Sequence, residues 1–175
     1  QQYSVEDFYK NTRFFGASWS PDRQKLLVSS NLSGIWNAYS FPVGGGDPQP
    51  LTQSTGNSIF AQSYFPGDER IIYTSDEGGN ELTHVYVRDP EGTTKDLTPG
   101  TKLKASFHGW AGDDKSFFVS TNERDARFFD LYEIAADGYA RTLLYRNTEG
   151  FEIGPVSRDK RYIALVRPRT TSDAD

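Results

Sequence analysis

The sequence predicts an all-β fold: a partial β-propeller with three four-stranded antiparallel blades, half of a fourth blade and a short N-terminal helix. Three columns of similar residues recur along the chain with a period of about 46 residues. The columns contain strand-opening apolar residues, tyrosines and leucines: Leu26, Ile71, Phe117 and Ile163; Tyr39, Tyr86 and Tyr132; Leu51, Leu97 and Leu143. A period kept in three independent columns indicates a repeat protein in which each copy forms one structural unit.

Each copy opens with a short apolar or aromatic run and a turn. The runs end at Trp19, Tyr64, Trp110 and Val156. The turns that follow contain Pro, Gly or Asp, which pre-set or tolerate tight-turn dihedral angles. Their sequences are Ser20-Pro21-Asp22, Phe65-Pro66-Gly67-Asp68, Ala111-Gly112-Asp113-Asp114 and Ser157-Arg158-Asp159. A first strand and a tight turn are therefore predicted in every copy.

The remaining elements of a copy are three more strands. Near-continuous apolar runs predict second strands that are buried on both faces, at Leu26-Leu27-Val28, Ile71-Ile72-Tyr73, Phe117-Phe118-Val119 and Ile163-Ala164-Leu165-Val166. Polar loops opening at Asn31, Asp76 and Asn122 lead to third strands centred on Ala38-Tyr39, Val85-Tyr86 and Leu131-Tyr132. Short fourth strands are predicted at Leu51-Thr52, Leu97-Thr98 and Leu143-Leu144. Four short strands per copy match one propeller blade.

The repeat sets the expected domain organisation. Residues 1–14 form a lead-in with a short helix, because Ser4 is a candidate cap and acids occupy the first turn. Residues 15–175 form an incomplete propeller, with blades at about 15–58, 59–104, 105–150 and a partial blade at 151–175. Propellers close with four to eight blades. We therefore expect a fragment whose uncovered blade faces and edges promote self-association.

Composition excludes several classes of function. The net charge of −5 and the absence of a basic patch argue against a nucleic-acid partner, and no apolar stretch approaches a membrane span. Without cysteine there are no disulfides and no thiolate metal sites, and no cofactor or metal is expected. A chain that begins at Gln1 rather than Met is consistent with removal of a secretory signal peptide, which predicts a periplasmic or secreted location. A boundary of other origin would look the same, so a cytoplasmic location stays open.

Two motifs resemble a known family. The segments Val5-Glu6-Asp7-Phe8 and Ser20-Pro21-Asp22 resemble the start of the propeller in prolyl oligopeptidase-family serine peptidases, which include dipeptidyl and acylaminoacyl peptidases. The repeat itself is similar to the TolB propeller repeat and, more generally, to WD40-like repeats. Repeat resemblance covers nearly the whole chain and implies the fold. Only the lead-in motif points to the peptidases.

The resemblance implies a propeller that gates peptide access to a C-terminal α/β-hydrolase domain, which would be the partner of this chain. The family's catalytic triad lies in that domain, and no G-x-S-x-G nucleophile elbow occurs here. No catalytic, cofactor-binding or metal-binding residue is therefore assigned. The alternative is a non-enzymatic TolB-like propeller that binds a protein partner. A hydrolase domain encoded downstream would discriminate between the two.

The two histidines are the first candidates for chemistry. His84 shares a column with Asn37 and Asp130, just before the third strand, which favours a polar tie within each blade. His108 lies on a first strand, in the column of Ala17, Gln62 and Gly154, and first strands line the channel of a propeller. It could face passing substrate there. Two histidines in different blades, without an acidic cluster, make a poor zinc site.

Other motifs have simpler interpretations. Ser157 and Lys160 have S-x-x-K spacing but occupy a turn, and Gly44-Gly45-Gly46 lacks the Lys and Ser/Thr of a phosphate loop. Asn31-Leu32-Ser33 is a sequon of a kind common by chance. The acids Asp76-Glu77 and Asp113-Asp114 are expected at solvated loop ends, and the segment 123–127 is expected in a charged loop before the third strand of blade three.

Overall fold

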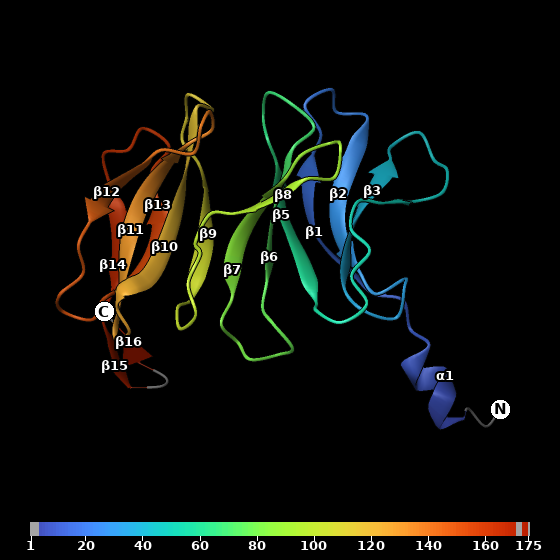
Figure 1. Cartoon of the computed structure of the whole chain (residues 1–175), viewed down its shortest axis with the longest axis horizontal. Coiled ribbons are helices and arrows are strands. Elements are labelled where there is room, and N and C mark those ends of the chain that lie inside the picture. The colour runs from blue at the N-terminus through green and yellow to red at the C-terminus, as the bar shows by residue number, and fades with distance from the viewer. Residues whose placement is uncertain (1–3, 171–172, 175) are drawn as a thin grey trace.

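A computed structural model describes residues 4–170 and 173–174, and its sheets stand side by side along the chain (Figure 1). Residues 1–3 of the expected lead-in and residues 171, 172 and 175 of the expected partial blade lie outside the described residues. Helix α1 (Val5–Tyr9) comes first. The Ser4 hydroxyl caps it by accepting a hydrogen bond from the Asp7 amide at 3.3 Å, and the Asp7 carboxylate accepts one from the Ser4 amide at 2.9 Å.

Three four-stranded antiparallel sheets follow in chain order. The first contains β1 (Phe14–Trp19), β2 (Lys25–Ser30), β3 (Asn37–Pro42) and β4 (Gln49–Pro50). The second contains β5 (Ile59–Tyr64), β6 (Ile71–Ser75), β7 (His84–Arg88) and β8 (Thr94–Asp96). The third contains β9 (Ala105–Trp110), β10 (Ser116–Asp125), β11 (Phe128–Ala135) and β12 (Arg141–Tyr145). Each sheet keeps its strands in sequence order, as a propeller blade does.

The fourth unit has two paired strands, β13 (Glu152–Val156) and β14 (Ile163–Val166). A small separate hairpin of β15 (Pro168–Thr170) and β16 (Asp173–Ala174) follows. Three complete blades and half of a fourth confirm the predicted partial β-propeller. None of the helical segments among residues 4–170 and 173–174 is long and apolar enough to cross a bilayer.

The core lies between the sheets, because the central strands of blades two and three bury side chains on both faces. In blade two, Ile71 and Tyr73 pack towards blade one, whereas Ile72 packs towards blade three. In blade three, Phe117 packs towards blade two and Phe118 towards blade four. This alternation explains why their second strands are apolar without a break. Each interior blade therefore depends on both of its neighbours.

The recurring Asp of the turns has one structural role. Its carboxylate accepts a hydrogen bond from the backbone amide two residues later, at 2.9–3.1 Å, which closes the turn before the second strand. The four residues are Asp22, Asp68, Asp113 and Asp159. A conformational requirement of the turn therefore accounts for this column.

The expected position of the fourth strand was wrong in blades one and two. Leu51-Thr52 and Leu97-Thr98 follow β4 and β8 instead of lying within them, whereas Leu143-Leu144 lies in β12. In blades one and two the Thr hydroxyl accepts the hydrogen bond of a third-strand amide, Ala38 at 2.9 Å and Val85 at 3.0 Å. A side chain replaces a backbone carbonyl there, so the regular ladder ends earlier than the apolar pattern suggests.

Most of the charged segment 123–127 is strand and not loop. Strand β10 continues to Asp125 and β11 begins at Phe128, so the connection shrinks to two residues. The charges pair within the sheet: Arg124 with Asp130, Arg127 with Asp125, and Arg141 with Glu123. These ion pairs let the polar segment extend the hairpin, which a pattern of apolar residues could not reveal.

Candidate functional site

The first strand of every blade carries a β-bulge at the same repeat position. The register shifts between Phe15 and Ser18 in β1, between Ala61 and Ser63 in β5, opposite Phe118 and Val119 in β9, and between Ile153 and Val156 in β13. The bulges contain the column of Ala17, Gln62, His108 and Gly154. Bulges redirect side chains and recur near functional sites. The side chains at this position are therefore set by a backbone feature built into each blade.

In blade three the bulge directs His108 towards Ser120, and the imidazole Nε2 lies 2.8 Å from the hydroxyl oxygen. In blade two the equivalent Gln62 donates to the Thr74 hydroxyl at 3.1 Å. Each pair joins the first strand to the second. Burial lowers the pKa of His108 below its ordinary value, so its ring is neutral at pH 7.

The His108–Ser120 pair has the contact that a nucleophile and its base require. Ser120 is only 3% exposed, however, and lies within the central strand β10. Ser120 borders the pocket described next, but so little of it is exposed that the hydroxyl is poorly placed to attack a substrate carbonyl. We therefore interpret the pair as a clip between strands, as its counterpart in blade two indicates.

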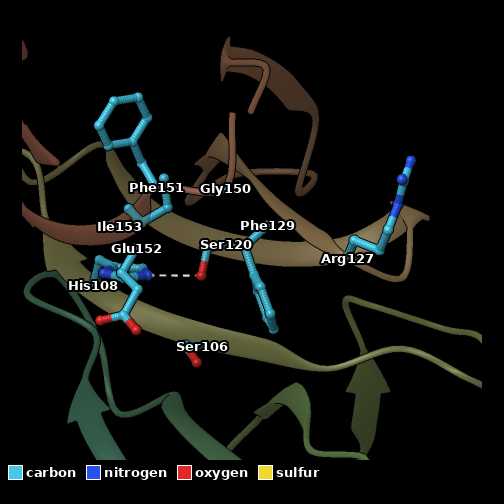
Figure 2. A pocket seen from close by; sticks show the side chains of 9 residues that line it. All are labelled: Ser106, His108, Ser120, Arg127, Phe129, Gly150, Phe151, Glu152 and Ile153. Carbon is cyan, nitrogen blue, oxygen red and sulfur yellow. Dashed lines mark hydrogen bonds between the residues drawn. The ribbon is translucent and has the colours of Figure 1, made fainter. Parts of the chain in front are cut away.

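A pocket of about 380 Å³ opens beside His108, between blades three and four (Figure 2). Figure 2 shows His108, Glu152 and Phe129 grouped around it, while Arg127 extends away. The wall mixes hydroxyl, imidazole, carboxylate and apolar groups. The lining residues are Ser106, His108, Ser120, Arg127, Phe129, Gly150, Phe151, Glu152 and Ile153. The volume lies in the range of about 300–1,000 Å³ typical of ligand sites.

A second pocket continues this surface towards blade two. It holds about 370 Å³ and shares Ser106 and Phe129 with the first. Gln62 and Thr74 contribute the wall on the blade-two side. The two pockets together form one indented surface that follows the first strands from blade two to blade four.

Aromatic rings dominate the corresponding surface of blades one and two. The ring centroids of Phe15 and Phe60 lie 5.7 Å apart, and Trp36 packs on Phe15 at 4.7 Å. Phe15 and Phe60 share a repeat column with Ser106 and Glu152. The same column is thus aromatic in two blades and polar in the other two.

His84 occupies the predicted polar column at the start of the third strand. Its Nδ1 lies 2.7 Å from the Asp96 carboxylate. Asn37 accepts a hydrogen bond from the Thr52 hydroxyl at 2.9 Å, and Asp130 accepts one from the Asn147 amide at 2.8 Å. All three side chains tie the third strand to the segment near the fourth. The structure therefore gives His84 a structural role in blade two, whereas His108 lies on β9 of blade three.

The other candidates do not converge. Ser157 donates to Asp159 at 2.7 Å, whereas the Lys160 ammonium donates to Glu133 at 2.6 Å, so the S-x-x-K pair is not a nucleophile and base. The side-chain oxygen of Asn31 accepts a hydrogen bond from the Arg13 amide at 2.7 Å. Within residues 4–170 and 173–174 no three His, Asp or Glu side chains gather to hold a metal ion.

Comparison with known proteins shows which proteins this chain resembles. No family model matches the sequence. Over 131 residues, 73% of the chain, it is 30% identical to dipeptidyl aminopeptidase BIII of Pseudoxanthomonas mexicana, and the match spans 19% of that protein. This homology supports a segment of the β-propeller of a prolyl oligopeptidase-family peptidase. The chain covers about a fifth of the curated relative's length.

Solved structures agree on the fold. TolB from Acinetobacter baumannii superposes with a TM-score of 0.65 at 19% identity, covering 93% of this chain and 39% of TolB. Prolyl oligopeptidase B from Galerina marginata gives 0.64 at 10% identity, covering 88% of this chain and 24% of that enzyme. These likenesses confirm the propeller fold and the resemblance to the propellers of TolB and of prolyl oligopeptidase. They carry no information about activity at such identities.

Proposed function

We propose that this chain is a non-catalytic part of a serine peptidase of the prolyl oligopeptidase family and that it controls the access of peptides to an α/β-hydrolase domain. The observation that carries the proposal is the match to dipeptidyl aminopeptidase BIII over 73% of the chain. The indented surface along the first strands supports it, because first strands face the channel of a propeller. The burial of Ser120 in the His108–Ser120 contact supports a non-catalytic role for this chain.

Labelling with a serine-directed fluorophosphonate tests the proposal. The product of the complete gene should be labelled on a serine outside residues 1–175 and should hydrolyse short peptides. The 175-residue chain alone should be neither labelled nor active. A complete gene without an α/β-hydrolase region, or labelling of a serine within this chain, would overturn the proposal.

The second candidate is a TolB-like propeller that binds a protein partner and takes part in no hydrolysis. Its support is the superposition on TolB over 93% of the chain. A periplasmic or secreted location is proposed for either function, and the TolB likeness is its support. Fractionation of the native cells, with blotting for this chain, tests the location.

A further inference from the structure

We propose that the pocket between blades three and four binds the basic side chain of a peptide, an Arg or Lys whose cationic head meets Glu152. The proposal rests on the proposed function, since it names the class of peptide that this propeller would select. It concerns a side chain, so it applies to peptides whatever their terminus. The pocket offers such a side chain an electrostatic part and an apolar part.

The electrostatic part is the charge of the lining. Glu152 is exposed at the start of β13, and among the described residues it forms no ion pair. The other charged lining residue, Arg127, is held by Asp125 at 2.8 Å and points away from the pocket (Figure 2). The neutral His108 ring does not cancel the carboxylate. The pocket therefore presents one uncompensated negative charge, which favours a cation.

The apolar part is the wall that a long basic side chain needs. Lys and Arg bury their methylene stems along apolar surface while the charged head reaches polar groups. Phe129 and Ile153 provide such a wall in the pocket, and Ser106 is an exposed hydroxyl beside it. An aromatic ring in the wall also attracts a cation through its face. At the edge of this pocket Arg167 already packs on the ring of the lining residue Phe151 at 4.6 Å, and Glu149 balances its charge at 3.0 Å.

Surface plasmon resonance tests the inference. The full 175-residue chain is immobilised at low density so that self-association does not interfere, and the probes are titrated over it. The probes are acetyl-Arg-Phe-amide, acetyl-Lys-Phe-amide and the neutral acetyl-Gln-Phe-amide. A fourth probe, Gln-Phe-amide with a free α-amine, separates the side chain from the terminus. We expect the two basic acetylated probes to bind at least about fivefold more tightly than the neutral one.

Two variants locate the contact. Glu152→Gln should remove the preference for basic probes, and Glu91→Gln, which removes another exposed acid from the loop between β7 and β8, should keep it. Equal affinity for all four probes, tighter binding of the free-amine probe alone, or an unchanged preference in Glu152→Gln would each overturn the inference. Fluorophosphonate labelling of the complete protein is independent of these titrations, so failure here leaves the proposed peptidase function standing.

Discussion

The Thr52 hydroxyl donates a hydrogen bond to the Asn37 side-chain carbonyl at 2.9 Å and accepts one from the Ala38 amide at the same distance. All three residues are buried. The bonds join the start of β3 to the segment after β4, and Thr98 makes the equivalent bond to the Val85 amide in blade two. A polar tie thus closes the outer edge of the first two blades.

Replacing Thr52 by the isosteric Val should lower the free energy of unfolding by about 1–3 kcal/mol, because it leaves the buried Ala38 amide without a partner and removes one of the two hydrogen bonds that the Asn37 carbonyl accepts. Urea denaturation measures this. The matched control is Thr55→Val, which changes an exposed threonine three residues later and should have almost no effect. Equal stability of the two variants would contradict the role assigned to the tie.

The His108→Gln variant should make stability less dependent on pH. Burial lowers the pKa of His108 in the folded chain, so below the ordinary value of 6.5 the unfolded chain takes up a proton that the folded chain resists. Stability is therefore lost as the pH falls from 6.5 towards the folded-state pKa. Gln can still bond to Ser120, as Gln62 bonds to Thr74. Urea denaturation at pH 7.5 and 5.5 should show a smaller loss in the variant than in the natural chain, and an equal loss would refute this assignment.

Phe118→Ala should cost about 3–5 kcal/mol. Phe118 is 1% exposed and packs against Ile153, Val156 and Ile163 of the fourth unit. Hydrogen exchange should therefore show lost protection in β13 and β14. In the control Phe117→Ala, loss should instead concentrate on the facing strands of blade two. The same exchange pattern in both variants would argue against separate interfaces on the two faces of β10.

Self-association is expected through the uncovered face of blade one. Trp19 is 54% exposed and lies opposite Leu26 in the β1–β2 pair. The next residue, Leu27, packs towards blade two, so Trp19 and Leu26 lie on the face turned away from blade two. Trp19→Lys should shift the sedimentation profile towards the monomer, because it places a charge on this apolar surface. Leu32→Lys, at a loop residue that is 44% exposed, should leave the profile unchanged. An identical shift in both variants would indicate a nonspecific effect of charge.

The periodicity of the sequence was sufficient to predict the sheets, because each repeat column reflects a local requirement: an Asp that closes a turn, or an apolar run buried on both faces. The hairpin extension at Glu123–Asp125 could not be predicted, since ion pairs across strands hold it. The bulge at His108 was also missed, although the polar residues Gln62 and His108 in its column were a signal. The pocket depends on how blades three and four meet, which no single repeat encodes.

The adjacency of successive blades within one chain is the central claim, and a cysteine cross-link tests it most directly. The hydroxyl oxygens of Ser18 in blade one and Ser63 in blade two lie 3.4 Å apart, and the chain contains no native cysteine. Mild oxidation of the Ser18→Cys, Ser63→Cys double variant should give an intrachain disulfide in the monomer fraction, detected by mass spectrometry without reduction. The pair Ser18→Cys, Ser120→Cys, between blades one and three, should give none. Disulfides found only between chains would show that the sheets pair across copies and would contradict the propeller arrangement.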